Sequence, residues 1–172
     1  MNYFILKTLN IKDENIQFEE KVEKSKFKGR LSLFYYGELS YTPSHCECCG
    51  EENEHHTVIK AGKKQSRITL PHISELPAYL ILKKQRFYCK ACNTYFTAQS
   101  PVVDKFCFIS KNTKMAILNK ATDIRSEASI AQDCSVSPTT VARFIDEAAE
   151  SLYQSPHRPL PKHLIMDRFK NI

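Results

Sequence analysis

The sequence lacks any apolar run long enough to cross a membrane. A transmembrane helix needs ~18 or more consecutive apolar residues, and no stretch of this chain approaches that length. A secretory signal is also missing, because the N-terminal residues MNYFILKTLNIKDEN have neither a basic leader nor a small-residue cleavage site. Internal repeats and low-complexity tracts are absent as well. We therefore expect a cytoplasmic protein with reduced thiols and no membrane partner.

The charge of the chain is modestly basic and unevenly distributed. The formal net charge is +6 over 172 residues, and the excess lies in residues 45–110 and 156–172. Residues 111–155 carry five basic and six acidic groups. A basic excess suits a polyanionic partner such as nucleic acid, although many other cytoplasmic proteins have one.

Four regions differ in their residue pattern. Together they predict an α+β protein, in which an N-terminal β-rich zinc-binding module is followed by a helical helix-turn-helix module. Residues 1–44 are expected to be the β-rich segment, 45–109 the zinc-binding module and 110–155 the helix-turn-helix DNA-binding domain. Residues 156–172 contain three prolines, a composition typical of a linker.

Runs of β-branched and aromatic residues predict the strands. Ile16–Val22 and Leu31–Tyr36 predict a hairpin, in which the polar stretch Glu23–Arg30 separates the two strands. Pro71 and Pro77 are expected to mark turns in the zinc-binding module. The strand-like runs of that module are Arg67–Leu70, Tyr79–Leu82 and Arg86–Tyr88.

The seven cysteines need a role other than disulfide formation in a reducing compartment. Cys46 and Cys49 form one pair with two residues between them, and Cys89 and Cys92 form a second pair with the same spacing. This spacing lets a tight turn aim two thiolates at one tetrahedral ion. Gly50 suits such a turn, because glycine accepts positive φ. We predict one structural Zn2+ with these four ligands, a closed site without a position for substrate.

Other interpretations of the cysteine-rich region remain. The 39 residues between the pairs exceed the spacing of compact zinc modules, but the entropy of loop closure grows only logarithmically with length. Two redox-active or buried pairs are the alternative to zinc. Five residues could compete as ligands, although solvated or packing roles are expected for them: Cys48, His45, His55, His56 and His72. Cys107 and Cys134 are expected to be buried packing residues. Phe106, Phe108 and Ile109 are expected to form core that links the two modules.

Residues Glu127–Glu147 (EASIAQDCSVSPTTVARFIDE) have the pattern of two helices joined by a short turn. Ser126 and Ser137 suit N-caps, and Pro138 follows at the first helical position, which tolerates proline. Lys111–Asp123 is expected to form a preceding support helix. The apolar residues that give the helices their inner faces are Ile130 and Cys134, then Val141, Phe144 and Ile145.

In a helix-turn-helix, the N-terminal residues of the second helix reach base edges in the major groove. The residues predicted to contact DNA are Ser137, Thr139, Thr140 and Arg143. Ser135 stands where glycine is common, and a left-handed backbone there costs on the order of 1 kcal/mol. Because this region is not basic, phosphate contacts are expected from elsewhere: Lys60, Lys63, Lys64, Arg67, Lys83, Lys84 and Arg86. A structural helical hairpin, with those basic residues as a solvated face, is the alternative.

The order of these parts resembles one family. A CxxCG pair, the segment YCKACNTYFT, the turn VSPTTV and the segment LPKHLIMDRFK follow one another as in the ISL-three family of insertion-sequence transposases. The resemblance covers nearly the whole chain and is strongest from His45 onward. It implies zinc ligands at Cys46, Cys49, Cys89 and Cys92, then a helix-turn-helix. An RNase-H-like domain with a DDE carboxylate triad for catalytic metals would follow.

The resemblance places the first catalytic carboxylate at Asp167. Arg168 departs from the family, which has an acidic residue there, and the sequence ends at Ile172. In this chain we expect Asp167 to be a solvated residue in a tail, and no catalytic residue is predicted. We therefore expect a truncated chain that is not an enzyme by itself and would act only if completed in trans.

The leading hypothesis is the DNA-binding N-terminal portion of a transposase, which recognises the terminal inverted repeats of its insertion sequence. Its expected partners are double-stranded DNA and either a second copy of the chain or the full-length transposase. The β part and the helix-turn-helix are expected to contact DNA jointly. A zinc-containing transcription regulator and a protein-interaction module remain as alternatives.

Overall fold

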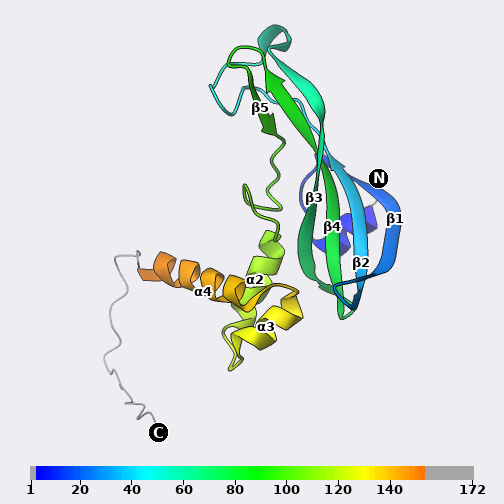
Figure 1. The fold of residues 1–172 in the computed structure, drawn as a ribbon, viewed down its shortest axis with the longest axis vertical. Coiled ribbons are helices and arrows are strands. Elements are labelled where there is room, and N and C mark those ends of the chain that lie inside the picture. Colours follow the sequence, from blue (N-terminus) through cyan, green and yellow to red (C-terminus); the bar gives the residue numbers. More distant parts are fainter. Residues whose placement is uncertain (1–2, 154–172) are drawn as a thin grey trace.

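The computed structural model describes residues 3–153, which form an α+β fold. A sheet of five strands makes up the larger part, and a group of helices follows it along the chain (Figure 1). None of the described helices is both long and apolar enough to span a bilayer. The elements are α1 (Tyr3–Leu9), β1 (Ile16–Phe27), β2 (Arg30–Leu39), η1 (Glu54–His56), β3 (Val58–Ile73), β4 (Leu76–Cys89), β5 (Thr94–Thr97), α2 (Lys111–Lys120), α3 (Glu127–Cys134) and α4 (Pro138–Tyr153).

The first two strands form the predicted hairpin. β1 pairs antiparallel with β2, and only Lys28 and Gly29 lie between them. Both residues have positive φ, 50° and 79°, as the tight turn that matches the twist of a hairpin requires. The prediction that Glu23–Arg30 separates the strands is wrong. β1 continues to Phe27, because the polar residues of an exposed edge strand still make the ladder hydrogen bonds.

β3 and β4 form a longer hairpin that contains the three strand segments predicted there. Its turn lies at Ser74 and Glu75, whose φ values are 50° and 63°. The prediction of turns at Pro71 and Pro77 is wrong, since both prolines lie inside strands. Pro71 lies at an irregularity in the β3–β4 register, and Pro77 is the second residue of β4. A missing N–H disturbs the ladder least at such positions.

A parallel pairing joins the two hairpins into one sheet. β2 pairs in parallel with β4, so the strand order is β1–β2–β4–β3, and β5 pairs with one end of β4. The N-terminal segment and the cysteine-rich region therefore contribute strands to the same sheet and residues to the same core.

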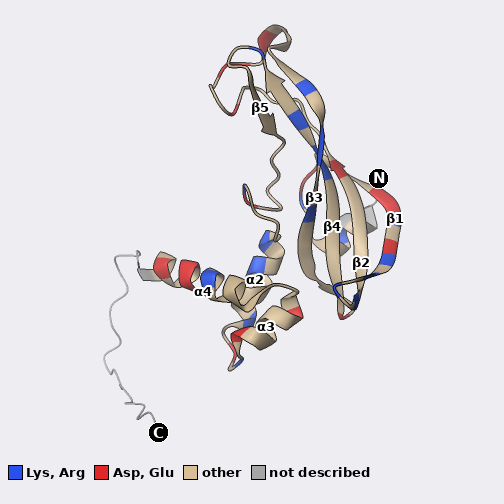
Figure 2. Cartoon of the chain, in the orientation of Figure 1, with Lys and Arg blue, Asp and Glu red and all other residues tan. Residues whose placement is uncertain are grey.

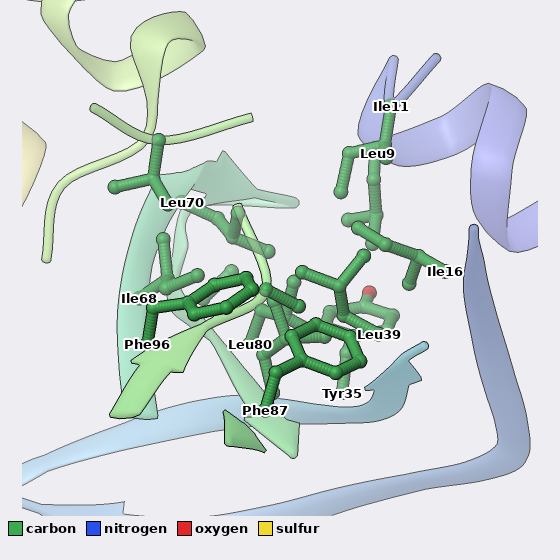
Figure 3. Packing of buried hydrophobic residues seen from close by; sticks show 14 of the residues in the cluster. Leu9, Ile11, Ile16, Tyr35, Leu39, Ile68, Leu70, Leu80, Phe87 and Phe96 are labelled. Carbon is green, nitrogen blue, oxygen red and sulfur yellow. The ribbon is translucent and has the colours of Figure 1, made fainter. Parts of the chain in front are cut away.

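The larger core lies on one face of this sheet. Leu39, Ile68 and Leu80 are all completely buried. Successive strand residues point to opposite faces, so the burial of alternate residues places this core on one side. Leu9 and Ile11, at the end of α1 and just after it, pack against the same cluster (Figure 3).

The helices α2, α3 and α4 share a smaller core of their own. The structure contains the predicted support helix at Lys111–Asp123, which ends at Lys120. The helices join the sheet through Thr69 of β3. Thr69 N donates to Phe108 O at 2.8 Å, and Ser110 N donates to Thr69 O at 2.9 Å. The buried residues of this helical core are Ile117, Ile130, Ala131, Cys134, Val141 and Phe144.

The segment between the two cores does not have the predicted apolar packing. Phe106 is 90% exposed and Phe108 is 56% exposed, so their prediction as core residues is wrong. Ile109 does pack against the helical core. The backbone bonds to Thr69 hold this segment in place, and its aromatic rings are therefore not needed to fix it.

Candidate metal centre and nucleic-acid interface

The first cysteine pair lies in a tight turn before β3. Cys46 N donates to Glu51 O at 2.8 Å, and Gly50 N donates to Cys46 O at 3.0 Å. Gly50 has a φ of 78°, the positive value predicted for it. The N–H of Cys48 also donates to Cys46 Sγ, at 3.3 Å. These bonds turn the chain so that the sulfurs of Cys46 and Cys49 face the same point.

The second pair lies at the turn between β4 and β5. Cys89 ends β4, and Cys92 lies in the turn itself. Lys90 N donates to Thr57 O at 2.9 Å, which ties this turn to the residue before β3. Most of the long insert between the cysteine pairs forms the β3–β4 hairpin, which folds back on itself and brings the pairs together.

The four predicted cysteines form one compact group. All four sulfur atoms lie within 4.8 Å of one another. Cys46 Sγ is 3.7 Å from Cys92 Sγ, and Cys49 Sγ is 3.9 Å from Cys89 Sγ. Four thiolates at ~2.3 Å from a tetrahedral zinc ion are separated by about 3.8 Å. The four sulfurs therefore fit a structural Zn2+ and can supply all four of its ligands.

Some thiols in this group ionise more readily than usual, and they oppose the ionisation of Cys49. Burial disfavours the Cys46 thiolate, but hydrogen bonds from the backbone of Cys49 and Cys48 lower the pKa of Cys46 to about 6. The backbone of Glu51 acts to lower the pKa of Cys49, but the Cys92 thiol, burial and the other cysteines raise it to about 12. A divalent cation between the sulfurs would remove this conflict, because it stabilises all four thiolates at once.

The other candidate ligands lie outside this group. Among the described residues, the cluster contains neither Cys48, which is exposed, nor any histidine. His72 lies near the opposite end of β3, where its Nε2 is 2.8 Å from Ser135 Oγ. Cys134 is buried in the helical core as predicted, whereas Cys107 is only half-buried.

α3 and α4 are joined by three residues, since α3 ends at Cys134 and α4 begins at Pro138. Ser135 has the left-handed backbone considered from the sequence, with φ 54° and ψ 39°. Ser126 is the predicted N-cap of α3, because its Oγ accepts from Ser129 N at 3.2 Å. The turn and the cap fix where each helix starts and stops.

The N-terminal end of α4 faces solvent. Ser137 is its predicted N-cap; Ser137 Oγ accepts from Thr140 N at 3.2 Å and lies 2.8 Å from Thr140 Oγ1. Thr139 and Arg143 are exposed, and Arg143 Nε is 3.8 Å from Glu147 Oε1. The four residues predicted to contact DNA thus lie within about two turns of one helix, and none is buried.

Two side chains of the sheet hold the turn between α3 and α4. Arg30 Nη1 donates to Gln132 O at 3.2 Å, and His72 bonds to Ser135. Burial lowers the pKa of His72 despite the nearby carboxylate of Asp133. Sequence patterns did not predict these contacts, because Arg30 and Gln132 are 102 residues apart. The only local signal was the Lys-Gly pair before Arg30, which is typical of a tight hairpin tip.

Acidic neighbours offset some of the basic residues that were predicted to contact phosphates. Lys63 Nζ is 2.6 Å from Glu38 Oε1, and Lys83 Nζ is 3.2 Å from Glu19 Oε1. Burial lowers the pKa of Lys84, and a neighbouring lysine adds to the shift. These three lysines are therefore weaker candidates for phosphate binding than their number in the sequence suggests.

The two arginines predicted as phosphate contacts lie over aromatic rings. Arg67 Cζ is 4.3 Å from the centroid of Phe27, and Arg86 Cζ is 5.1 Å from that of Tyr95. Stacking leaves the edge of a guanidinium free to donate hydrogen bonds. Both arginines therefore keep their capacity to bind an anion.

The cysteine cluster and the helical pair lie at opposite ends of the β3–β4 hairpin (Figure 1). Val58, the first residue of β3, pairs with Cys89, whereas Ile73, the last, pairs with Leu76. The 16 residues of β3 correspond to about 50 Å at ~3.3 Å per residue. The metal site therefore stabilises the far end of the sheet and does not contact α4.

Asp167, to which the family resemblance assigns the first catalytic carboxylate, lies outside the described residues, as does the rest of 154–172.

Comparison with known proteins places the cysteine cluster in a recognised kind of module. Residues 42–92 match the family model described as the zinc-finger of transposase IS204/IS1001/IS1096/IS1165. The matched range contains both cysteine pairs and the hairpin between them. No curated protein and no solved structure matches the chain. Residues 42–92 are thus similar to a transposase zinc finger, and the four clustered sulfurs support a structural Zn2+.

Proposed function

We propose that this chain is the DNA-recognition part of an insertion-sequence transposase and binds the terminal inverted repeats of its element. The observation that carries the proposal is the transposase zinc-finger match over residues 42–92. The four cysteines inside that match have sulfurs within 4.8 Å of one another, as a metal-bound ribbon requires. Transposases act on DNA, and double-stranded DNA is accordingly the proposed partner.

In this proposal α3 and α4 are a helix-turn-helix, and α4 enters the major groove. The hydroxyls of Ser137, Thr139 and Thr140 suit hydrogen bonds to bases or phosphates, and Arg143 suits bidentate bonding to guanine. The ion pair of Arg143 with Glu147 is long, at 3.8 Å, and its arginine side chain is 59% exposed. Such a pair contributes little, so a base can replace the carboxylate at small cost.

The proposal divides the chain by role. The sheet, with zinc at its far end, is a scaffold, and residues 110–155 read DNA. Two separate hydrophobic clusters support this division. No catalytic step is assigned to the described residues, because an ion held by four cysteines has no open coordination position.

A protein-interaction module is the second candidate. Exposure of Phe106 and Phe108 on the loop before α2 favours it, because aromatic rings are enriched at protein interfaces. The slight acidic excess of residues 111–155 also suits a protein partner better than a phosphate backbone.

Fluorescence anisotropy tests the proposal. The probe is a labelled duplex taken from the DNA ends that flank the gene, compared with a scrambled duplex at near-physiological salt. We expect a preference on the order of 10³-fold or more for the flanking duplex. Equal and strongly salt-dependent binding to both duplexes contradicts sequence recognition and leaves generic phosphate attraction. No binding to either duplex favours the protein-interaction candidate.

Two variants of α4 separate base reading from helix stability. Thr139→Ala combined with Arg143→Ala removes two exposed groups at the N-terminal end of the helix. We expect this protein to bind the flanking duplex about as weakly as the scrambled one, a loss of about 1–3 kcal/mol per base contact. Ser151→Ala, at the other end of α4, is the matched control and should keep the preference.

A further inference from the structure

The tip of the β1–β2 hairpin lies beside the turn between α3 and α4. Arg30 Nη1 donates to Gln132 O at 3.2 Å and fastens the tip to the end of α3. A groove of about 310 Å³ lies between the two elements. Its walls include Lys28 and Arg30 on the hairpin side and Ser135, Val136 and Ser137 on the helical side. The hairpin tip and the N-cap of α4 therefore share one groove.

Three cations gather around Phe27 at this tip. Lys28 Nζ lies 5.7 Å from the centroid of the Phe27 ring, and Arg67 Cζ lies 4.3 Å from it. Arg30 is directly opposite Phe27 in the β1–β2 ladder, so it lies on the same face. All three side chains are exposed. We call Lys28, Arg30 and Arg67 the tip cluster.

In the described part of the chain, no ion pair balances the charge of the tip cluster. The ion pairs found within residues 3–153 include none of its three members. Lys63 and Lys83 of the same sheet are, in contrast, paired with glutamates. Asp133, which precedes the α3–α4 turn, is itself bound by Lys120 and Arg125. An unbalanced positive charge is therefore concentrated next to the start of α4.

We propose that the tip cluster binds phosphates of the DNA backbone at the edge of the site that α4 reads. This inference rests on the proposed DNA recognition. It adds phosphate contacts that the helices do not supply, because residues 111–155 carry more acidic than basic groups. Ser137 lines the same groove as Lys28 and Arg30. A duplex that meets the N-terminal end of α4 thus brings its backbone to the tip. The positive end of the helix dipole acts in the same direction.

A pair of charge-matched double variants tests this inference. Lys28→Gln with Arg67→Gln removes two positive charges from the tip cluster but keeps the contact of Arg30 with α3. Lys24→Gln with Lys26→Gln removes two charges from the same hairpin and serves as the control. Lys24 and Lys26 are also exposed, but alternation along β1 places them on the face opposite Phe27. Zinc content and thermal unfolding establish that both variants are folded.

Anisotropy is measured over a range of salt concentrations, with the flanking-end duplex and with the scrambled duplex. We expect the tip variant to bind both duplexes more weakly by a similar factor, on the order of tenfold at physiological salt. The slope of log K against log salt should fall in magnitude by about one for each phosphate that the variant no longer neutralises. The control variant should keep the wild-type affinity and slope.

The outcomes separate this inference from the proposed function. Unchanged affinity and slope in the tip variant, or an equal loss in the control, overturns the inference while DNA recognition stands. A loss confined to the flanking-end duplex also overturns it, because phosphate contacts act on all sequences alike. If the wild-type protein binds neither duplex, DNA recognition and the inference fail together.

Discussion

The two ends of the β3–β4 hairpin are held together by different means. At the ribbon end, the two cysteine turns contribute only Cys46 and Cys89 to the buried core, and four sulfurs converge on one point. At the helical end, α2, α3 and α4 share a small apolar core and reach the sheet by hydrogen bonds. Figure 2 shows that charge is also distributed differently, with lysines and arginines along the sheet and several acidic residues on α4.

The amount of apolar surface that each end can bury explains this difference. A turn of a few residues buries too little to order itself, and metal–ligand bonds supply the missing free energy. Short helices are marginal alone, and they gain stability by packing on one another and on a larger neighbour. The two ends should therefore respond to different perturbations.

Removal of one zinc ligand should have the largest effect. Structural zinc contributes on the order of 10 kcal/mol in small zinc modules. Cys46→Ser should therefore lose the metal and unfold the ribbon end, which metal analysis and thermal unfolding measure. Cys48→Ser is the control, because Cys48 is exposed and outside the cluster. Retention of one zinc per chain by Cys46→Ser would show that another ligand completes the site.

Truncation in the helical core should have the next largest effect. Ile130 is 1% exposed, and Ile130→Ala should cost about 2–5 kcal/mol. We expect the helical circular dichroism to be lost at a lower temperature while zinc stays bound. Ile124→Ala removes the same atoms at a fully exposed position and should change little. Release of zinc together with helix unfolding would mean that the two ends form one cooperative unit.

The contact between His72 and the α3–α4 turn should give the smallest effect. The bond to Ser135 contributes about 1 kcal/mol, and His72→Ala should lose that amount of helical stability. Burial lowers the pKa of His72 in the folded protein, so the unfolded chain binds the proton more readily. The stability that His72 contributes is present above the unfolded pKa of ~6.5 and is lost as the pH falls below it.

Urea unfolding of the helices above and below that pKa measures this pH dependence. His72→Ala should be less sensitive to acid than the wild type. His56→Ala changes an exposed histidine at the ribbon end and should keep the wild-type response. The same loss of sensitivity in both variants would contradict a specific role for His72.

Local chemistry accounts for the features that the sequence predicted well. The spacing of the cysteine pairs, the positive φ of Gly50 and the caps at Ser126 and Ser137 all depend on residues within a few positions of each other. Turn and cap geometry have the same short range, which is why pattern rules find them.

The wrong predictions concern residues whose type suggests one local structure while tertiary pairing imposes another. Pro71 and Pro77 are turn-forming residues by composition, yet the sheet accommodates both at places where a missing N–H costs little. Phe106 and Phe108 are apolar, yet backbone bonds fix their segment and leave the rings exposed. In both cases the local preference of the residue is overridden, because pairing with neighbouring segments determines which groups are hydrogen-bonded and buried.

The residues of this chain thus determine where strands turn, where helices start and which side chains can bind a metal. They do not show locally that β2 pairs in parallel with β4, or that the insert between the cysteine pairs folds back on itself. The contact of the β1–β2 tip with the α3–α4 turn is likewise absent from any short pattern. Such pairings join distant segments, and only the burial of the whole core offsets the loss of conformational entropy. These pairings therefore depend on the complete fold. The placement of the tip cluster beside α4 depends on it as well.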